Sequence, residues 1–298
     1  MRNAIALLIT LMFVMLISVG IGYGLMQLKK ASNSVEDERV LYENSMILND
    51  VLAMLQNSKD LRHLADNNSS DELYAFLQSS KYLPLQLGDE KILLSLKSAR
   101  SKVNINTLNK HNEQLFRNYF ERYMVDGNYL NILKECMRKN QAKDEYNSYT
   151  STLFDQYPTL FRQYIASKKH LEIINSYYIH EYGDTNLKKV PFDKLFDYMS
   201  TSDEAVDLNY VTEDVWELIT GASKERAKAL YQGEGSYKTF DDLHLSTEER
   251  ANIGKFQTTF FAPYILVEIT ISKENSSAKI RFKYDIKLKK GYDFVFEV

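Results

Sequence analysis

The chain has 298 residues, with 37 basic and 40 acidic side chains, and its formal net charge is only -3. This balance argues against a basic protein that coats nucleic acid, and the length allows one large or two smaller domains beyond the N-terminal segment. The single cysteine, Cys136, excludes an intramolecular disulfide, and its apolar neighbours indicate a buried thiol rather than a reactive one.

An uncharged apolar run from Ala4 to about Met26 comes first in chain order. It is long enough for a helix that crosses a bilayer core, which needs about 20 residues, so we expect a single transmembrane helix. A cleaved secretory signal would have a shorter apolar stretch and an Ala-x-Ala exit, which this run lacks. A plain signal anchor is the alternative, and the basic residues Arg2, Lys29 and Lys30 on its two sides do not orient it.

The helix is expected to continue to about Gln56, because no proline or glycine occurs in residues 27–56. Mostly apolar residues recur every three or four positions along one face of this part, which we call the seam, and charged residues fill the other face. Such a seam packs either on the protein's own domain or on helices of partner proteins, and periodicity alone does not distinguish the two. The predicted partner-helix seam consists of Leu28, Ala31, Val35, Tyr42 and Leu52.

The middle of the chain contains two similar hexapeptides, residues 103–108 (Val-Asn-Ile-Asn-Thr-Leu) and 206–211 (Val-Asp-Leu-Asn-Tyr-Val). We call them the two repeats. Each alternates like a short strand and then meets a polar residue suited to capping a helix, with Thr212 as the candidate after the second. Apolar residues at helical spacing follow both repeats. They predict two similar strand-to-helix modules.

Residues 218–230, in the second module, read as a helix, a glycine-centred turn and a second helix. This pattern resembles a helix-hairpin-helix or SAM-like unit, in which Gly221 adopts a positive φ and Ser223 caps the second helix. Some such units hold a DNA phosphate on the backbone amides of the turn. A packing unit without DNA is the favoured alternative, because Ser223 replaces a second glycine and Glu225 is close. The candidate DNA-contacting residues are Thr220, Gly221, Ser223 and Lys224.

The pattern changes from helix to strand in the last part of the chain. Residues 264–271 are rich in β-branched side chains, and apolar and charged residues alternate from 279 to 288. A turn at 289–291 then leads to a third strand, and residues 91–96 can join from earlier in the sequence. We expect an antiparallel sheet whose apolar face packs on the long N-terminal helix.

This arrangement resembles the K-type minor pseudopilins of bacterial type II secretion systems, also called general secretion pathway protein K. Residues 2–9 (Arg-Asn-Ala-Ile-Ala-Leu-Leu-Ile) are similar to the basic leader and apolar start of that family. The two repeats and the phenylalanine-led segment 259–264 are similar to further family features. The resemblance implies an α+β fold, with a long transmembrane and stalk helix packed on a small antiparallel sheet and inserted SAM-like or helix-hairpin-helix modules.

The resemblance also implies processing and a position in the filament. A prepilin peptidase would cleave between Ala4 and Ile5, although the family has glycine where this chain has Ala4. Major pseudopilins carry a glutamate where this chain has Ile9. An unpaired carboxylate is costly in lipid, so a major pseudopilin must pair this glutamate with a neighbouring subunit. K-type proteins lack the glutamate, and its absence implies a place at the pseudopilus tip. The implied partners are other minor and major pseudopilins, the bacterial inner membrane and the peptidase, with a cytoplasmic N-terminus and a periplasmic C-terminal domain.

No cofactor, metal or catalytic residue is assigned from the sequence. The acidic segment associated with calcium in some family members has no counterpart here. His180-Glu181 lacks the second histidine of the His-Glu-x-x-His zinc motif, and no phosphate loop or Gly-x-Ser-x-Gly appears. The remaining histidines are scattered, at His63, His111, His170 and His244.

Three functions therefore stay open. The first is a minor pseudopilin that initiates or caps a filament for protein secretion or for DNA uptake in transformation. The second is a membrane-anchored DNA-binding protein that uses the Gly221 turn, and the third is a generic single-pass periplasmic adaptor. The expected divisions are a leader at 1–4, the transmembrane and stalk helix at 5–57, the start of the α/β domain at 58–102, helical modules at 103–205 and 206–257, and C-terminal strands at 258–298.

Overall fold

The structure is a computed structural model that describes residues 42–87, 90–137, 151–199, 205–273 and 276–297. The chain divides into two compact units, Met1–Ser58 and Lys59–Val298. In the first unit, residues 42–57 are helical, as expected for the end of the long N-terminal helix. No helix within the described residues is long and apolar enough to span a membrane. The apolar run Ala4–Met26 lies outside them, and packing of the helix on the sheet stays a prediction.

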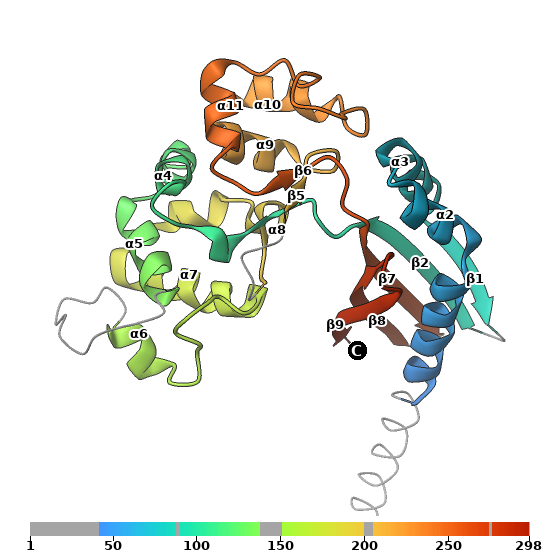
Figure 1. Ribbon diagram of the computed structural model, residues 1–298. Helices are drawn as coiled ribbons and strands as arrows, with labels where there is room; N and C mark the ends of the chain where they lie inside the picture. The colour runs from blue at the N-terminus through green and yellow to red at the C-terminus, as the bar shows by residue number, and fades with distance from the viewer. Residues whose placement is uncertain (1–41, 88–89, 138–150, 200–204, 274–275, 298) are drawn as a thin grey trace, which may run out of the picture. The chain divides into compact units, whose positions relative to one another are not determined.

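The second unit contains a five-stranded antiparallel sheet of order β1-β2-β7-β8-β9 (Figure 1). Leu94 of β2 lies opposite Ile269 of β7, which in turn lies opposite Ile280 of β8. All three side chains are buried, so the alternation of these strands produces the apolar face that the sequence predicts. The strands are β1 Leu83–Leu87, β2 Glu90–Ser98, β7 Tyr264–Lys273, β8 Ser276–Asp285 and β9 Lys290–Glu297.

The other face of the sheet is polar and carries cross-strand ion pairs. Glu268, on β7, lies 2.8 Å from Lys97 Nζ on β2 and 3.4 Å from Lys279 Nζ on β8. These pairs join three neighbouring strands on one face. They explain why charged residues alternate with apolar ones in this part of the sequence.

The end of β8 differs from the sequence prediction. Residues 286–289 form a turn in which Lys289 has a φ of 56°, and Leu288 is 68% exposed. The predicted strand to Leu288 and the predicted turn at 289–291 are therefore both placed too late. Apolar alternation continues through the turn, so the pattern does not reveal it. Strand β1, which contains Pro84 and lies at the sheet edge where proline is tolerated, is a further strand that the sequence analysis missed.

Two helices precede the sheet in the second unit, α2 Lys59–Asn67 and α3 Ser70–Ser79. Ser69 caps α3, since its side chain accepts a hydrogen bond from the Glu72 N–H at 3.3 Å. The residue after α3, Ser80, accepts a backbone hydrogen bond from Leu96 of β2 at 3.2 Å. This contact holds the end of α3 beside the sheet.

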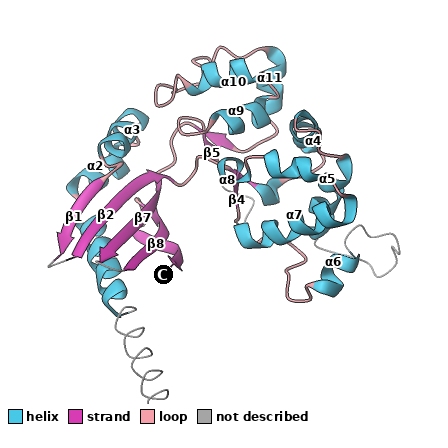
Figure 2. Ribbon diagram, turned by 180° about the vertical axis from the view of Figure 1, so that it is seen from behind, coloured by secondary structure: helices cyan, strands magenta, loops and turns pink. Residues whose placement is uncertain are grey.

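The chain leaves the sheet after β2 and returns at β7, and two helical modules are inserted between these strands (Figure 2). Each module begins and ends with a two-residue strand, and the two strands pair in parallel. The first module contains β3 Val103–Asn104, η1 Ile105–Thr107, α4 Glu113–Arg122, α5 Gly127–Cys136, α6 Ser151–Gln156, α7 Lys168–Tyr182, η2 Thr185–Lys189, α8 Phe192–Leu195 and β4 Phe196–Asp197. The second contains β5 Val206–Asp207, α9 Glu213–Thr220, α10 Lys224–Tyr231, α11 Thr247–Ile253 and β6 Thr258–Thr259.

A continuous apolar core joins the two modules. The ring of Phe116 stacks on Phe196 of its own module, with centroids 5.9 Å apart, and lies 6.2 Å from Phe256 of the second module. Cys136 is buried in this core, as the sequence predicts, and Trp216 is buried there as well. The boundary expected at 205–206 thus separates two repeats in sequence but not two hydrophobic cores.

Candidate functional site

The two repeats fold in the same way. Asn106 and Asn209 occupy the same position in them, and each amide bonds to both backbone groups of one distant residue. Asn106 donates to the carbonyl oxygen of Ile165 at 3.0 Å and accepts from its N–H at 2.8 Å. Asn209 makes the same pair with Tyr237, at 2.8 and 2.9 Å. Each amide also donates to a third carbonyl near the end of its module. Each asparagine therefore ties the start of its module to two later segments.

The repeats differ two residues earlier, where Asn104 corresponds to Asp207. Both side chains accept a hydrogen bond from the backbone N–H two residues further on, at 3.1 Å. The second carboxylate oxygen of Asp207 also accepts from the Ala262 N–H at 2.8 Å. Burial raises the pKa of Asp207 to about 7, against the opposing effect of these two amide hydrogen bonds. The second module therefore has a buried acid where the first has a neutral amide.

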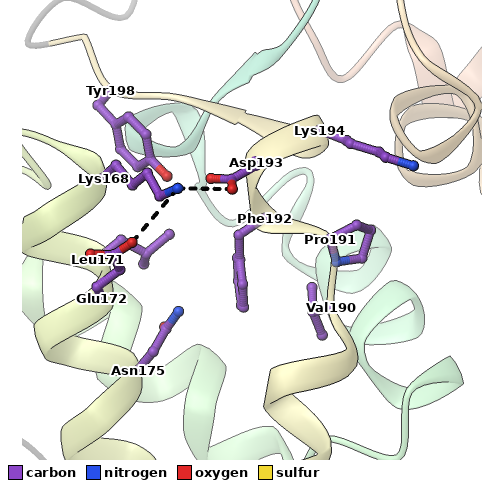
Figure 3. A pocket seen from close by; sticks show the side chains of 10 residues that line it. All are labelled: Lys168, Leu171, Glu172, Asn175, Val190, Pro191, Phe192, Asp193, Lys194 and Tyr198. Carbon is purple, nitrogen blue, oxygen red and sulfur yellow. Dashed lines mark hydrogen bonds and ion pairs between the residues drawn. The ribbon is translucent and has the colours of Figure 1, made fainter. Parts of the chain in front are cut away.

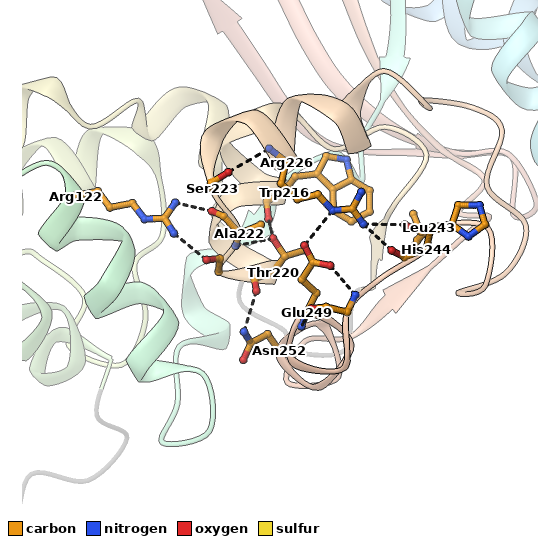
Figure 4. Close-up of polar contacts among 12 residues, drawn as sticks. Arg122, Trp216, Thr220, Ala222, Ser223, Arg226, Leu243, His244, Glu249 and Asn252 are labelled. Atoms are coloured by element: carbon orange, nitrogen blue, oxygen red, sulfur yellow. Dashed lines mark hydrogen bonds and ion pairs between the residues drawn. The ribbon is translucent and has the colours of Figure 1, made fainter.

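The turn between α9 and α10 has the local geometry that the sequence predicts (Figure 4). Gly221 has a φ of 71°, in the left-handed region that favours glycine. The Ser223 side chain caps α10 by accepting from the Arg226 N–H, and Thr212 caps α9 by accepting from the Val215 N–H at 3.3 Å. The glycine and both caps were identifiable because each role restricts the residue type.

Two backbone amides of this turn, those of Gly221 and Ala222, are used inside the protein. The Gly221 N–H donates to the carbonyl of Glu217, and the Ala222 N–H donates to the Thr220 hydroxyl, both at 3.1 Å. Turn amides that hold a phosphate must instead point at the ligand. These contacts favour the packing interpretation, and DNA binding through this turn stays an untested prediction. Of the four candidate residues, Lys224 is exposed and Thr220 is buried.

Two side chains from elsewhere hold the carbonyl groups of the turn (Figure 4). Arg122, the last residue of α4, donates to the carbonyl oxygens of Gly221 and Ala222, each at 2.8 Å, and forms an ion pair with Glu217. Asn252 of α11 donates to the Thr220 carbonyl at 2.8 Å. The turn is thereby attached to the first module as well as to its own. Arg122 lies far away in sequence, and no local pattern identifies it.

The predicted N-terminal site residues fall mostly outside the described residues. Ala4, Ile5, Ile9, Leu28, Ala31 and Val35 all precede residue 42. Of the remaining two seam residues, Tyr42 is 68% exposed and Leu52 is partly buried. The partner-helix seam and the processing site therefore stay predictions.

The histidines do not form a catalytic group with one another. His170 is buried, and its Nδ1 accepts a hydrogen bond from the Ala166 N–H at 3.2 Å. The other four are exposed, and His180 lies beside Glu181 at 3.4 Å. Within the described parts of the chain, no three His, Cys, Asp or Glu side chains are grouped to hold a metal ion.

No family model matches the chain, and no curated protein matches its sequence. A solved structure does match in three dimensions. It is a chain from the crystal structure of the GspK–GspI–GspJ complex of the enterotoxigenic Escherichia coli type 2 secretion system. The match has a TM-score of 0.54 and 12% sequence identity, and covers 86% of this chain and 99% of that chain. The fold is GspK-like.

The GspK-like fold accounts for the architecture described above. It is an α+β fold, with helices and a five-stranded antiparallel sheet. Because the sequence identity is only 12%, the similarity shows the fold and not the activity. The binding properties of this chain are therefore argued as proposals.

Proposed function

We propose that the chain is a minor pseudopilin, a subunit of the short periplasmic filament of a type II secretion system or of a related DNA-uptake machine. The observation that carries the proposal is the GspK-like fold over 86% of the chain. That solved structure is a complex with GspI and GspJ, so we propose other minor and major pseudopilins as partners. The role is structural, and no catalytic activity is proposed.

We place the subunit at the tip of the filament, where it initiates or caps assembly. Ile9 offers no membrane carboxylate to a subunit above it, and an apolar residue at this depth carries no desolvation cost. The two modules inserted between β2 and β7 add a bulky body, which suits a subunit with no neighbour above it. The apolar run Ala4–Met26 anchors the chain in the bacterial inner membrane, with the body in the periplasm.

Co-purification of the full-length chain with the pseudopilins of its own organism tests this function. We expect a stable complex with at least two of them, and no complex with any of them would contradict the proposal. Tyr42→Glu, in the predicted seam, should weaken the complex because it places a charge at a helix–helix contact. Tyr82→Glu is the matched control, since Tyr82 is 65% exposed and Tyr42 is 68% exposed. Equal effects of the two variants would remove the seam from the proposal.

The mature N-terminus provides a second test. Mass spectrometry of the chain from its native membrane should find an N-methylated Ile5 if a prepilin peptidase cleaves after Ala4. Active protein that retains Met1 would contradict the processing step. It would leave the fold unchanged.

A further inference from the structure

Two segments of the chain connect the sheet to the helical modules. Residues 99–102 lead from β2 into β3, and residues 260–263 lead from β6 back into β7. The two segments begin side by side, because the Ala99 N–H donates to the carbonyl oxygen of Tyr264 at 2.9 Å. We call these two segments the junction.

Asp207 of the second repeat is bonded to both segments of the junction. Its backbone N–H donates to the carbonyl oxygen of Arg100 at 2.9 Å, and its carboxylate Oδ2 accepts from the Ala262 N–H at 2.8 Å. The other carboxylate oxygen accepts from the Asn209 N–H at 3.1 Å. The residue is fully buried. One side chain of the second module therefore holds the segment by which the chain returns to the sheet, while its backbone holds the segment by which the chain leaves.

The first repeat performs a similar holding role without an ionisable group. Asn104, which corresponds to Asp207, accepts from the Met199 N–H at 3.2 Å and donates to the Met199 carbonyl oxygen at 3.1 Å. Met199 follows the last strand of the first module, as Ala262 follows that of the second. An amide is therefore sufficient to hold a segment at this position, and the carboxyl group of Asp207 adds a charge that can be gained or lost.

The groups around Asp207 offer little support to a negative charge. The titratable side chains on the surrounding elements are Arg100, Tyr264, Tyr210, Tyr74 and Glu234. The guanidinium of Arg100 lies over the ring of Tyr264, 4.2 Å from its centroid. Burial and the Asp207 charge both raise the pKa of Tyr210, which stays neutral. Burial raises the pKa of Asp207 to about 7, and only the two backbone amides oppose this effect among the described residues.

We propose that Asp207 is a pH-sensitive clamp on the junction between the sheet and the helical modules. The neutral carboxyl group keeps the segments through Arg100 and Ala262 together. An ionised carboxylate is costly in this buried place, so its charge favours a state in which the junction opens and water reaches the side chain. Opening releases the Asp207 proton to solvent. The clamp contains no residue of the predicted helix seam, and it does not depend on the proposed pseudopilin function.

Hydrogen–deuterium exchange of the full-length chain in detergent, read by mass spectrometry from pH 5 to pH 8, tests this proposal. Peptides covering residues 258–264 report on the Ala262 amide, and peptides covering residues 195–199 report on the Met199 amide. After correction for intrinsic exchange, opening at Ala262 should increase roughly fiftyfold from pH 5 to pH 7 and about twofold from pH 7 to pH 8, given a pKa near 7 when closed and about 3.9 when hydrated. Met199 should show no such increase, because Asn104 does not titrate.

Asp207→Asn should remove the increase at Ala262. Glu234→Gln is the control, since it removes a neighbouring acid that does not bond to the junction, and it should keep the increase. The two modules of the wild type can be compared even if Asp207→Asn does not fold. The increase must also occur while the centre of β7 stays protected, which distinguishes local opening from global unfolding.

Three results would overturn the proposal. They are pH-independent opening at Ala262, an equal increase at Met199, and exchange at Ala262 that is no faster than exchange at the centre of β7. Persistence of the increase in a folded Asp207→Asn variant would also contradict it. None of these results would affect the co-purification test of the pseudopilin function.

Discussion

The Nζ atom of Lys283, on β8, lies 2.7 Å from Oδ2 of Asp197, on β4. The Lys283 side chain is only 10% exposed, and Asp293 is its second acidic neighbour, at 3.4 Å. The pair connects the sheet to the first helical module across a long separation in sequence. Because a cation at this site is largely shielded from water, it depends on its partners to offset the cost of burial.

Asp197→Asn should lower the free energy of unfolding by about 1–3 kcal/mol, because it leaves a mostly buried lysine with one acidic neighbour. Urea denaturation measures this change. The control is Asp241→Asn in the exposed pair Arg250–Asp241, whose side chains are 60% and 86% exposed. Its loss should stay below about 1 kcal/mol. Similar losses at both sites would show that burial does not strengthen the Lys283 pair.

Asn106→Ala and Asn209→Ala should each destabilise the protein by about 2–4 kcal/mol, since each removes three hydrogen bonds and leaves backbone groups without partners. The similar geometry of the two repeats predicts similar losses. Asn118→Ala, at an exposed position where the amide bonds to Gln114 alone among the described residues, should cost about 0.5 kcal/mol or less. If Asn209→Ala lowered the free energy of unfolding as little as Asn118→Ala, the conclusion that this asparagine ties its module together would be contradicted. Chemical denaturation followed by circular dichroism gives all three values.

Asp207 should make stability depend on pH. Its folded pKa of about 7 lies above the unfolded value, so the folded state holds the proton more tightly. The stability from this group is complete below about pH 4 and is lost as the pH rises through 7, by at most about 1.4 kcal/mol per pH unit. Urea midpoints between pH 4.5 and 8 should show this decline in the wild type and a smaller decline in Asp207→Asn. Parallel curves for the two proteins would contradict a raised pKa.

Gly221→Ala should destabilise the protein by about 1–3 kcal/mol, through its positive φ and through crowding. A Cβ at this position would lie 3.2 Å from both Asn252 Nδ2 and Leu115 Cδ2. Gly183→Ala is the matched control, because Gly183 has a φ of 66° and no atom within 4 Å of its added Cβ. Thermal unfolding should show a larger loss for Gly221→Ala. Equal losses would mean that the turn can move away from α4 and α11.

Local sequence patterns were sufficient for much of the fold. The caps at Thr212 and Ser223 and the positive φ of Gly221 were predicted because each role allows few residue types. The two repeats indicated two modules because their asparagines recur at the same spacing. β-branched residues indicated β7, alternation indicated β8 and a turn signal indicated β9, but the alternation also extended β8 through a turn.

The remaining features depend on contacts between distant residues. Arg122 holds a turn about a hundred residues later, and the Tyr129 hydroxyl donates to Asn175 on another helix. Neither residue belongs to a pattern that a sequence window can detect. A pocket in the first module, between α7 and residues 190–198, was missed for the same reason, since its walls come from two segments that are separated in the sequence (Figure 3). Strand β1 was missed because a five-residue edge strand containing Pro84 has little strand character.

The pairing of β2 with β7 also constrains the order of folding. Leu94 and Ile269 are neighbours in the sheet, but both helical modules lie between them in the chain. During synthesis β7 emerges after both helical modules, so β2 is made before the central strand with which it pairs. If the chain between β2 and β7 were unfolded, the closing of so long a loop would slow their pairing. In each folded module the first and last strands pair, and this pairing brings the two ends of the module together. We therefore expect the two helical modules to fold before β7 pairs with β2.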